Sequence, residues 1–237
     1  MVKRTRLSPP IPLLRHTLGE ARFAGDWVRG RLVEDRLARH FPGDGRTIMV
    51  IPGLFTSDLR TAGLRRVLRK AGYRAHGWGL GRNMPIRADL LDRLDVRLDE
   101  LQAREEGPVT LIGWSLGGLV AREYAKHAPD RVGGVITMGT PFSGDPRANR
   151  AWRVYEMVAD HKVDAPPIGL DRSTKPPVHT TALWSARDGI IAAEAARGLP
   201  HERDVEMEIR CGHFAMSSAP DALEAVLKSL LLQSKKG

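Results

Sequence analysis

A serine between glycines is the first feature of this sequence that could do chemistry. Ser115 lies in the run Gly113-Trp114-Ser115-Leu116-Gly117, after an apolar segment and before an amphipathic one that ends near His127. These patterns predict a strand and then a helix, with the serine on the sharp turn between them. Side chains at positions 113 and 117 would collide with such a turn, which explains the glycines. The helix N-terminus would also direct free N–H groups toward a developing oxyanion.

A serine hydroxyl needs a histidine to take its proton and a carboxylate to orient that histidine. Of the eight histidines, we select His213, which follows the predicted strand 205–210 and precedes a closing helix. For the acid we select Asp188, which lies three residues beyond the predicted strand 178–185 and is followed by a glycine that allows a tight turn. Asp145 and Asp171 are the alternative acids. The predicted catalytic residues are therefore Ser115, Asp188 and His213.

An oxyanion hole requires two backbone N–H donors. Leu116, directly after the serine, would supply one. The loop "IPGLF" after the first predicted strand would supply the other, with Leu54 as the first choice and Phe55 as the alternative. Phe55, Trp114, Trp152 and Tyr155 are the candidate substrate-binding residues, although Trp152 and Tyr155 could equally form a small core of their own.

The elements that must position these residues alternate along the chain. Apolar runs predict strands at 47–53, 73–78, 108–114, 132–140, 178–185 and 205–210. Helical patterns occupy 13–40, 57–70 with Ser57 as N-cap, 88–104, 116–127 and 221–232. Helices between strands require crossover connections, so we expect a doubly wound, mostly parallel sheet in an α/β fold. In such sheets functional groups gather beyond the carboxyl ends of the strands, where the three candidate catalytic residues fall.

At this point the chain resembles the α/β-hydrolase family, and most of all its small lipase- and esterase-like serine hydrolases. The resemblance rests on the elbow "GWSLGG", the loop "IPGLF", the segment "TMGTPFSG" and the late pair "SARDGI" and "CGHF". One departure is Pro52-Gly53, where many relatives have His-Gly in the oxyanion loop. The resemblance implies an α/β-hydrolase domain at 46–237 with a lid or cap insertion at about 145–178. Residues 1–45 fall outside it and form a helical, basic N-terminal segment.

Charge and composition limit the partners that we expect. Hydrophobic residues make up 42% and charged residues 27%, which is typical of a globular protein. The net charge is +9, and residues 1–46 hold ten Lys and Arg against five Asp and Glu. A solvated arginine-rich surface is the first interpretation, and docking on an anionic membrane or substrate is the second. Arg147, Arg150 and Arg153 carry the same two interpretations. No recognition motif for nucleic acid accompanies the basic charge.

The leading hypothesis is hydrolysis of a carboxylic ester through an acyl-enzyme, without metal or cofactor. A thioesterase or acyltransferase with the same triad is the alternative enzyme. A hypothesis of another class is a non-catalytic, membrane-associated hydrolase-like protein that docks through residues 1–45. The single cysteine, Cys211, permits no internal disulfide, and the proline-broken N-terminus lacks the apolar core of a signal peptide. We therefore expect a cytoplasmic protein, with peripheral membrane contact as the alternative.

Overall fold

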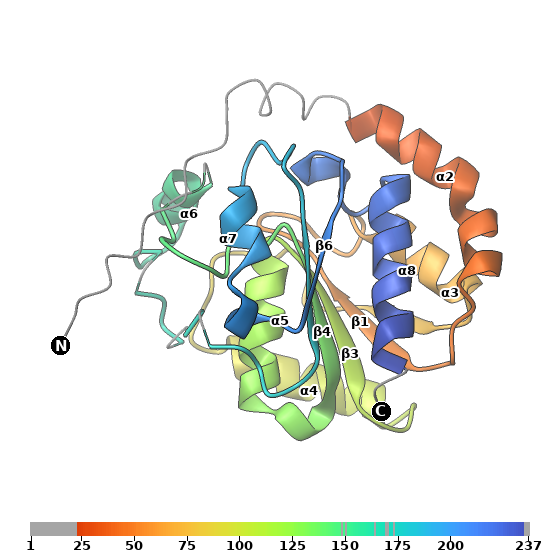
Figure 1. Cartoon of the computed structure of the whole chain (residues 1–237). Coiled ribbons are helices and arrows are strands. Elements are labelled where there is room, and N and C mark those ends of the chain that lie inside the picture. Colours follow the sequence, from red (N-terminus) through yellow and green to blue (C-terminus); the bar gives the residue numbers. More distant parts are fainter. Residues whose placement is uncertain are drawn as a thin grey trace.

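Six parallel strands form the single sheet at the centre of the computed structural model (Figure 1). The structure describes residues 23–147, 149, 151–163, 165–168, 171–172 and 174–234. The strands are β1 (Thr47–Ile51), β2 (Arg74–Gly77), β3 (Val109–Trp114), β4 (Val132–Met138), β5 (Thr180–Trp184) and β6 (Val205–Glu208), in the order β2-β1-β3-β4-β5-β6. All six lie within the ranges that the sequence predicts, and the parallel sheet is confirmed.

Burial differs between the central and the edge strands. Every residue of β1 and β3 is buried, and their apolar runs are what a sheet covered on both faces requires. The edge strands β2 and β6 instead include exposed and half-buried polar residues. An edge strand has a neighbour on one side only, so it tolerates polar residues that would be costly at the centre of the sheet.

Helices cover both faces of the sheet (Figure 1). On one face, α2 (Phe23–His40), α3 (Ala62–Lys70) and α8 (Pro220–Ser234) pack against Ile48, Val50 and Ile112. On the other face, α4 (Leu90–Gln102) and α5 (Leu116–His127) pack against Met49, Ile51 and Leu111. The alternation along β1 is the two-residue period of a strand, which gives each face its own apolar core. The remaining helices are short: η2 (Pro129–Arg131), α6 (Trp152–Val158), α7 (Ala193–Arg197), η3 (Pro200–Glu202) and η4 (His213–Ala215).

Two expectations about helices need correction. The helix expected from residue 57 begins at Ala62 and Ser57 does not cap it, because residues 57–61 form turns in which Arg60 N–H donates to Ser57 O and Thr61 N–H to Asp58 O. The sequence predicts no helix between residues 127 and 221, but the structure has the short helix α6 within the segment 145–178 and the short helix α7 after β5. The N-terminal helix is observed as α2, and its expected portion 13–22 lies outside the described residues.

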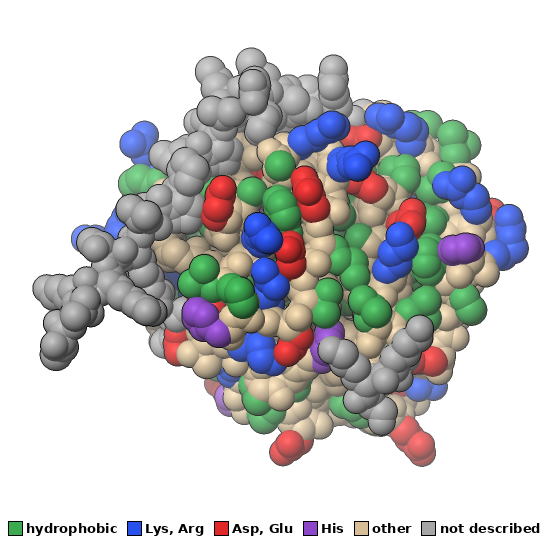
Figure 2. All heavy atoms as spheres, in the orientation of Figure 1, with side chains coloured by type: hydrophobic (Ala, Val, Ile, Leu, Met, Phe, Trp, Pro, Cys, Tyr) green, Lys and Arg blue, Asp and Glu red, His purple; other side chains and the backbone are tan. Residues whose placement is uncertain are grey.

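The basic charge of α2 is largely balanced by neighbouring acids. Arg29 pairs with Asp26, and Arg31 and α3 residues Arg66 and Lys70 pair with the buried carboxylate of Glu34. Figure 2 shows Lys and Arg side chains interspersed with Asp and Glu on this face of the molecule. This pattern favours the solvated-surface interpretation for α2. None of the helices in the described ranges is both long and apolar enough to cross a bilayer.

Candidate active site

Ser115 occupies a strained turn between β3 and α5. Its backbone has φ 54° and ψ −121°, a left-handed φ that costs a non-glycine residue about 1–3 kcal/mol. The flanking glycines are needed for close contacts. A Cβ at Gly113 would lie 2.3 Å from the carbonyl oxygen of Gly117, and one at Gly117 would lie 2.4 Å from that of Ile51. The turn that the glycine spacing predicts is therefore the turn that the structure contains.

Hydrogen bonds from β4 hold this turn in place. The N–H of Ser115 donates to Met138 O at 2.8 Å, which continues the β3–β4 pairing past the end of the strand. The hydroxyl of Thr140 donates to Ser115 O at 3.0 Å. A Cβ at Gly118 would lie 1.9 Å from the Thr140 hydroxyl, so the same threonine also explains the third glycine of the motif. These contacts hold the Ser115 backbone in the strained conformation that exposes its side chain.

Asp188 and His213 form a buried pair. The distance from His213 Nδ1 to Asp188 Oδ2 is 2.7 Å, and each residue is 3% exposed. The other carboxylate oxygen, Oδ1, accepts from Ile190 N–H at 2.8 Å and Ile191 N–H at 2.7 Å. Because an ionised carboxylate only accepts, His213 Nδ1 carries the proton in this pair, and Nε2 becomes the nitrogen able to take one. Asp188 is thus held in position to orient the imidazole.

The elbow and the Asp–His pair meet at the same edge of the sheet. The ring of Trp114, the residue before Ser115, lies 5.7 Å from the imidazole of His213 between centroids. Gly139 follows the β4 residue that receives the Ser115 N–H, and a Cβ there would lie 3.1 Å from Asp188 Oδ2. The fold therefore brings the ends of β3, β5 and β6 together, with the three candidate catalytic residues beyond them.

In the loop after β1, the Leu54 N–H has no hydrogen-bond acceptor among the described residues. Phe55 has φ 60°, and its N–H donates to Asn83 O at 2.7 Å, so it is already occupied. Within the described part of the chain, Leu54 N–H donates no hydrogen bond. Leu116 is the first residue of α5, and its N–H has no acceptor within the helix. Neither N–H group therefore has an acceptor among the described residues.

Asn83 fastens this loop, and sequence reasoning missed it. Its side-chain Nδ2 donates to Pro52 O at 2.6 Å, and its backbone N–H donates to Thr56 O at 2.7 Å. Phe55 N–H also donates to Asn83 O, so three hydrogen bonds join Asn83, which is 2% exposed, to the five-residue loop 52–56. A signal was present in the sequence, because Asn83 follows β2 at the same end of the sheet as the other site residues.

Ser115 opens into a small apolar cavity. The cavity has a volume of about 50 Å³ and includes Leu54, Leu116 and Leu119 in its wall. Trp152 and Tyr155, two of the predicted substrate-binding residues, also line it, and both come from α6 in the segment between β4 and β5. The other two lie elsewhere. Phe55 lines a separate surface groove with Trp27 and Arg60, and Trp114 is 2% exposed in the core beside His213.

The segment between β4 and β5 is attached to the rest of the domain at both ends. Near its start, Asn149 forms an isolated antiparallel β-bridge with Ile191, and within the segment the guanidinium groups of Arg147 and Arg153 lie 5.7 and 5.3 Å from the centre of the Trp152 ring. Arg147 precedes α6, so it does not share a helical face with Arg153, and Arg150 lies outside the described residues. Near the end, buried Arg122 of α5 donates to the carbonyls of Arg172 and Thr174. These contacts hold the segment over Ser115.

Arg122 is a second residue that the sequence did not single out. It is completely buried, its guanidinium lies 4.2 Å from the Phe142 ring, and it donates a third hydrogen bond to Glu202 O. Burial lowers its pKa to about 10, which still leaves it charged near neutral pH. A buried arginine is costly unless its donors find partners. Here three backbone carbonyls accept hydrogen bonds from the two terminal nitrogens, whereas Nε has no partner among the described residues. Its role is evident only when segments distant in sequence have been placed together.

Comparison with known proteins agrees with this architecture. Residues 79–165 match the family model described as the alpha/beta hydrolase fold. The biotin biosynthesis bifunctional protein BioHC of Teredinibacter turnerae is 40% identical over 62 residues, which are 26% of this chain and 10% of that protein. The pimeloyl-[acyl-carrier protein] methyl ester esterase of Shewanella woodyi is 30% identical over 113 residues, 46% of this chain and 42% of that protein. The chain thus spans less than half the length of either curated relative.

A solved structure extends the likeness to most of the chain. The monoacylglycerol lipase of Paleococcus ferrophilus superposes with a TM-score of 0.56 at 18% identity, covering 80% of this chain and 96% of that one. At this identity the likeness concerns the fold. Together with the parallel sheet, the strained serine turn after β3 and the match of residues 79–165 to the family model, it shows that this chain has the α/β-hydrolase fold.

Proposed function

We propose that the protein hydrolyses carboxylic esters through an acyl-enzyme on Ser115. His213 takes the serine proton through Nε2 as the hydroxyl attacks the ester carbonyl, and it returns the proton to the leaving alcohol. Asp188 holds the ring and stabilises the imidazolium. A water molecule, activated by the same histidine, then releases the acid. The observation that carries this proposal is the buried 2.7 Å Asp188–His213 hydrogen bond at the sheet edge where Ser115 is held in a strained turn.

The N–H groups of Leu116 and Leu54 are the proposed oxyanion hole. Both lie on backbone that is fixed before substrate arrives, Leu116 by the start of α5 and Leu54 by the loop that Asn83 fastens. Preorganised donors need no rearrangement as charge develops, and the loss of one such donor typically reduces kcat by about 100- to 1000-fold. The Shewanella woodyi relative is a methyl ester esterase, which supports an ester bond as the target.

The size of the cavity bears on the acyl group. Its volume of about 50 Å³ is well below the roughly 150 Å³ of a cavity that accommodates benzene. Even a short acyl chain would therefore require Trp152 or Tyr155 to shift. We propose on this basis that the segment around α6 acts as the lid, and that residues 145–178 open when substrate binds.

A series of p-nitrophenyl esters from acetate to decanoate tests the activity. We expect turnover that is lost in Ser115→Ala, with a preference for short chains because the cavity is small. A parallel series of acyl thioesters, with and without an alcohol acceptor, separates an esterase from a thioesterase or acyltransferase. The proposal fails if the protein cleaves none of these substrates, and it fails equally if Ser115→Ala retains the wild-type rate. Binding of anionic vesicles without any turnover would support the non-catalytic alternative.

A further inference from the structure

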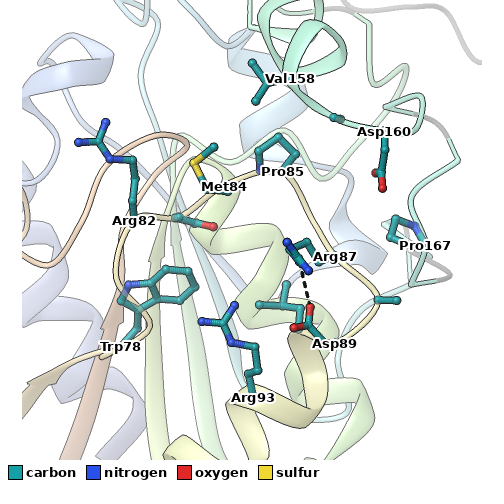
Figure 3. Close-up of a pocket in the computed structure, with 14 residues that line it drawn as sticks. Trp78, Arg82, Met84, Pro85, Arg87, Asp89, Arg93, Val158, Asp160 and Pro167 are labelled. Atoms are coloured by element: carbon teal, nitrogen blue, oxygen red, sulfur yellow. Dashed lines mark hydrogen bonds and ion pairs between the residues drawn. The ribbon is translucent and has the colours of Figure 1, made fainter.

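A second, much larger hollow adjoins the candidate active site. It is an open groove of about 690 Å³ between the loop that follows β2, the start of α4 and the end of α6 (Figure 3). Its apolar wall includes Trp78, Met84, Pro85, Leu90 and Val158. The volume is more than ten times that of the cavity at Ser115. The groove can therefore hold a substantial part of a molecule whose reacting end enters the cavity.

One partition separates the groove from the cavity. Ile86 and Tyr155 line the cavity, whereas their chain neighbours Pro85 and Arg87, and Val158 one turn later on α6, line the groove. Ile86 N–H donates to the hydroxyl of Tyr155 at 3.2 Å, so the partition is a direct contact. The Tyr155 hydroxyl also lies 2.8 Å from His161 Nε2. A ligand that passes from the groove to the cavity between Ile86 and Tyr155 would have to displace this contact.

The charged side chains of the groove are mainly arginines. Arg82, Arg87 and Arg93 line it, against the carboxylates of Asp89 and Asp160. In Figure 3, Arg87 and Arg93 project toward the middle of the groove, and Arg82 extends toward its outer rim. Three guanidinium groups around one groove have fifteen N–H donors between them, a geometry that suits the oxygens of a phosphate group.

Both carboxylates of the groove are already engaged. Asp89 accepts from Arg87 at 3.3 Å, and Asp160 lies 2.8 Å from His161 Nδ1. By contrast, the Arg93 side chain makes one hydrogen bond with the described residues, a long one of 3.4 Å to Leu80 O. Arg82 makes no ion pair or hydrogen bond with any residue that the structure describes. Two cationic side chains therefore retain most of their donors for a ligand.

We propose that this groove is the subsite for a phosphate group on the part of the substrate that leaves when the ester or thioester is cleaved. The proposal rests on the proposed ester hydrolysis at Ser115. Two sources share this chemistry, a phosphorylated carrier arm such as phosphopantetheine and a phosphorylated glycerol. In either case the acyl group enters the cavity past Ile86 and Tyr155, and the phosphate remains among Arg82, Arg87 and Arg93.

Matched substrate pairs test the proposal, because the members of each pair differ only by the phosphate. One pair is S-butyryl-pantetheine and S-butyryl-4′-phosphopantetheine, and the other is 1-butyryl-glycerol and 1-butyryl-glycerol 3-phosphate. We expect kcat/KM for the phosphorylated member to be about tenfold higher or more in at least one pair, as for a charge-assisted hydrogen bond. The pair that shows the preference identifies the source. The preference should decrease as the salt concentration rises from about 0.05 to about 0.5 M, because salt screens the attraction between exposed charges.

The arginines are then tested by the ratio of the two kcat/KM values within a pair. Arg82→Gln and Arg93→Gln should each reduce that ratio by about threefold or more, and the double variant should reduce it further. The matched control is Arg104→Gln, an exposed arginine beyond the opposite end of α4, which should leave the ratio unchanged. Ratios near one in both wild-type pairs, or wild-type ratios in the double variant, would overturn the subsite.

Failure of the subsite is distinct from failure of the ester hydrolysis. Hydrolysis of p-nitrophenyl butyrate without any phosphate preference overturns the subsite alone. Absence of p-nitrophenyl butyrate hydrolysis together with absence of Ser115 labelling by a fluorophosphonate overturns the proposed function, and the subsite with it. Inorganic phosphate provides a check that needs no turnover of the phosphorylated substrates. It should inhibit p-nitrophenyl butyrate hydrolysis less in the double variant than in Arg104→Gln.

Discussion

Replacement of Asn83 by alanine would test how the oxyanion loop is held. The substitution removes the side-chain donor to Pro52 O, a 2.6 Å hydrogen bond, and leaves both backbone hydrogen bonds of residue 83 in place. Pro52 is buried, so its carbonyl would lose its partner at a cost of about 1–3 kcal/mol. The loop can regain some of that energy by moving, and any movement displaces the Leu54 N–H two residues away.

The expected magnitude follows from that displacement. Complete loss of one oxyanion donor reduces kcat by about 100- to 1000-fold, and a loop that remains partly fastened should give a reduction of about 10- to 1000-fold. KM should change little, because the donor binds the oxyanion more strongly than the ground-state carbonyl. Asn83→Asp should be at least as damaging, since it places an acceptor against the Pro52 carbonyl in nearly the same volume.

The assay combines kinetics with stability. We would measure kcat and KM for p-nitrophenyl butyrate, urea unfolding, and inhibition by a trifluoromethyl ketone, whose serine adduct carries an oxyanion. The inhibition constant should rise in proportion to the fall in kcat. Ser229→Ala is the control, because it removes a buried hydroxyl that donates to Ala225 O within α8, away from the site. If Asn83→Ala lowers stability but leaves kcat and the inhibition constant within about twofold of wild type, the positioning role is refuted.

Three further predictions address the triad, the turn and the buried carboxylate of Glu34. Asp188→Asn should lower kcat by about 10⁴-fold with the fold intact, because His213 loses the carboxylate that fixes its tautomer; a loss below tenfold would contradict that role. Gly117→Ala should destabilise the protein by about 1–3 kcal/mol or more in urea unfolding, whereas Gly25→Ala on exposed α2 should be neutral or stabilising by up to about 1 kcal/mol. Burial alone would raise the pKa of Glu34, but hydrogen bonds from an arginine and a lysine of α3 outweigh it and hold that pKa below its usual range. The stabilisation by Glu34 should therefore be complete above the ordinary glutamate pKa and be lost as pH falls through the lowered pKa. The difference in unfolding free energy between wild type and Glu34→Gln should accordingly shrink from pH 7 to pH 3. A difference that stays constant would contradict this.

The parts of the site that could be predicted share one physical property. Ser115, Asp188 and His213 each follow a strand, and apolar runs reveal where buried strands end. Parallel strands place those ends together, so the position of each residue along the chain predicts its neighbours in space. The parallel sheet and the strained serine turn are expectations that the structure confirms, whereas the catalytic roles of the three residues stay proposals.

The features that could not be predicted depend on contacts between distant segments. Arg122 looks like an ordinary charged residue of an amphipathic helix until the carbonyls around it are placed. Asn83 was overlooked because the strand before it is short and half polar, which weakens the apolar signal. Ser57 is a good N-cap residue, yet the turns that follow it delay the helix to Ala62. Contacts with distant segments decide the roles of Arg122 and Asn83, whereas local turns decide where the helix after Ser57 begins.

The central claim is that Ser115 is the nucleophile, and covalent labelling tests it most directly. The native protein would be treated with a fluorophosphonate, digested, and analysed by mass spectrometry to locate the added group. We predict one modification, on Ser115, which is absent in Ser115→Ala and slower to form in His213→Ala. A modification on another residue, or labelling that persists in Ser115→Ala, would contradict the account.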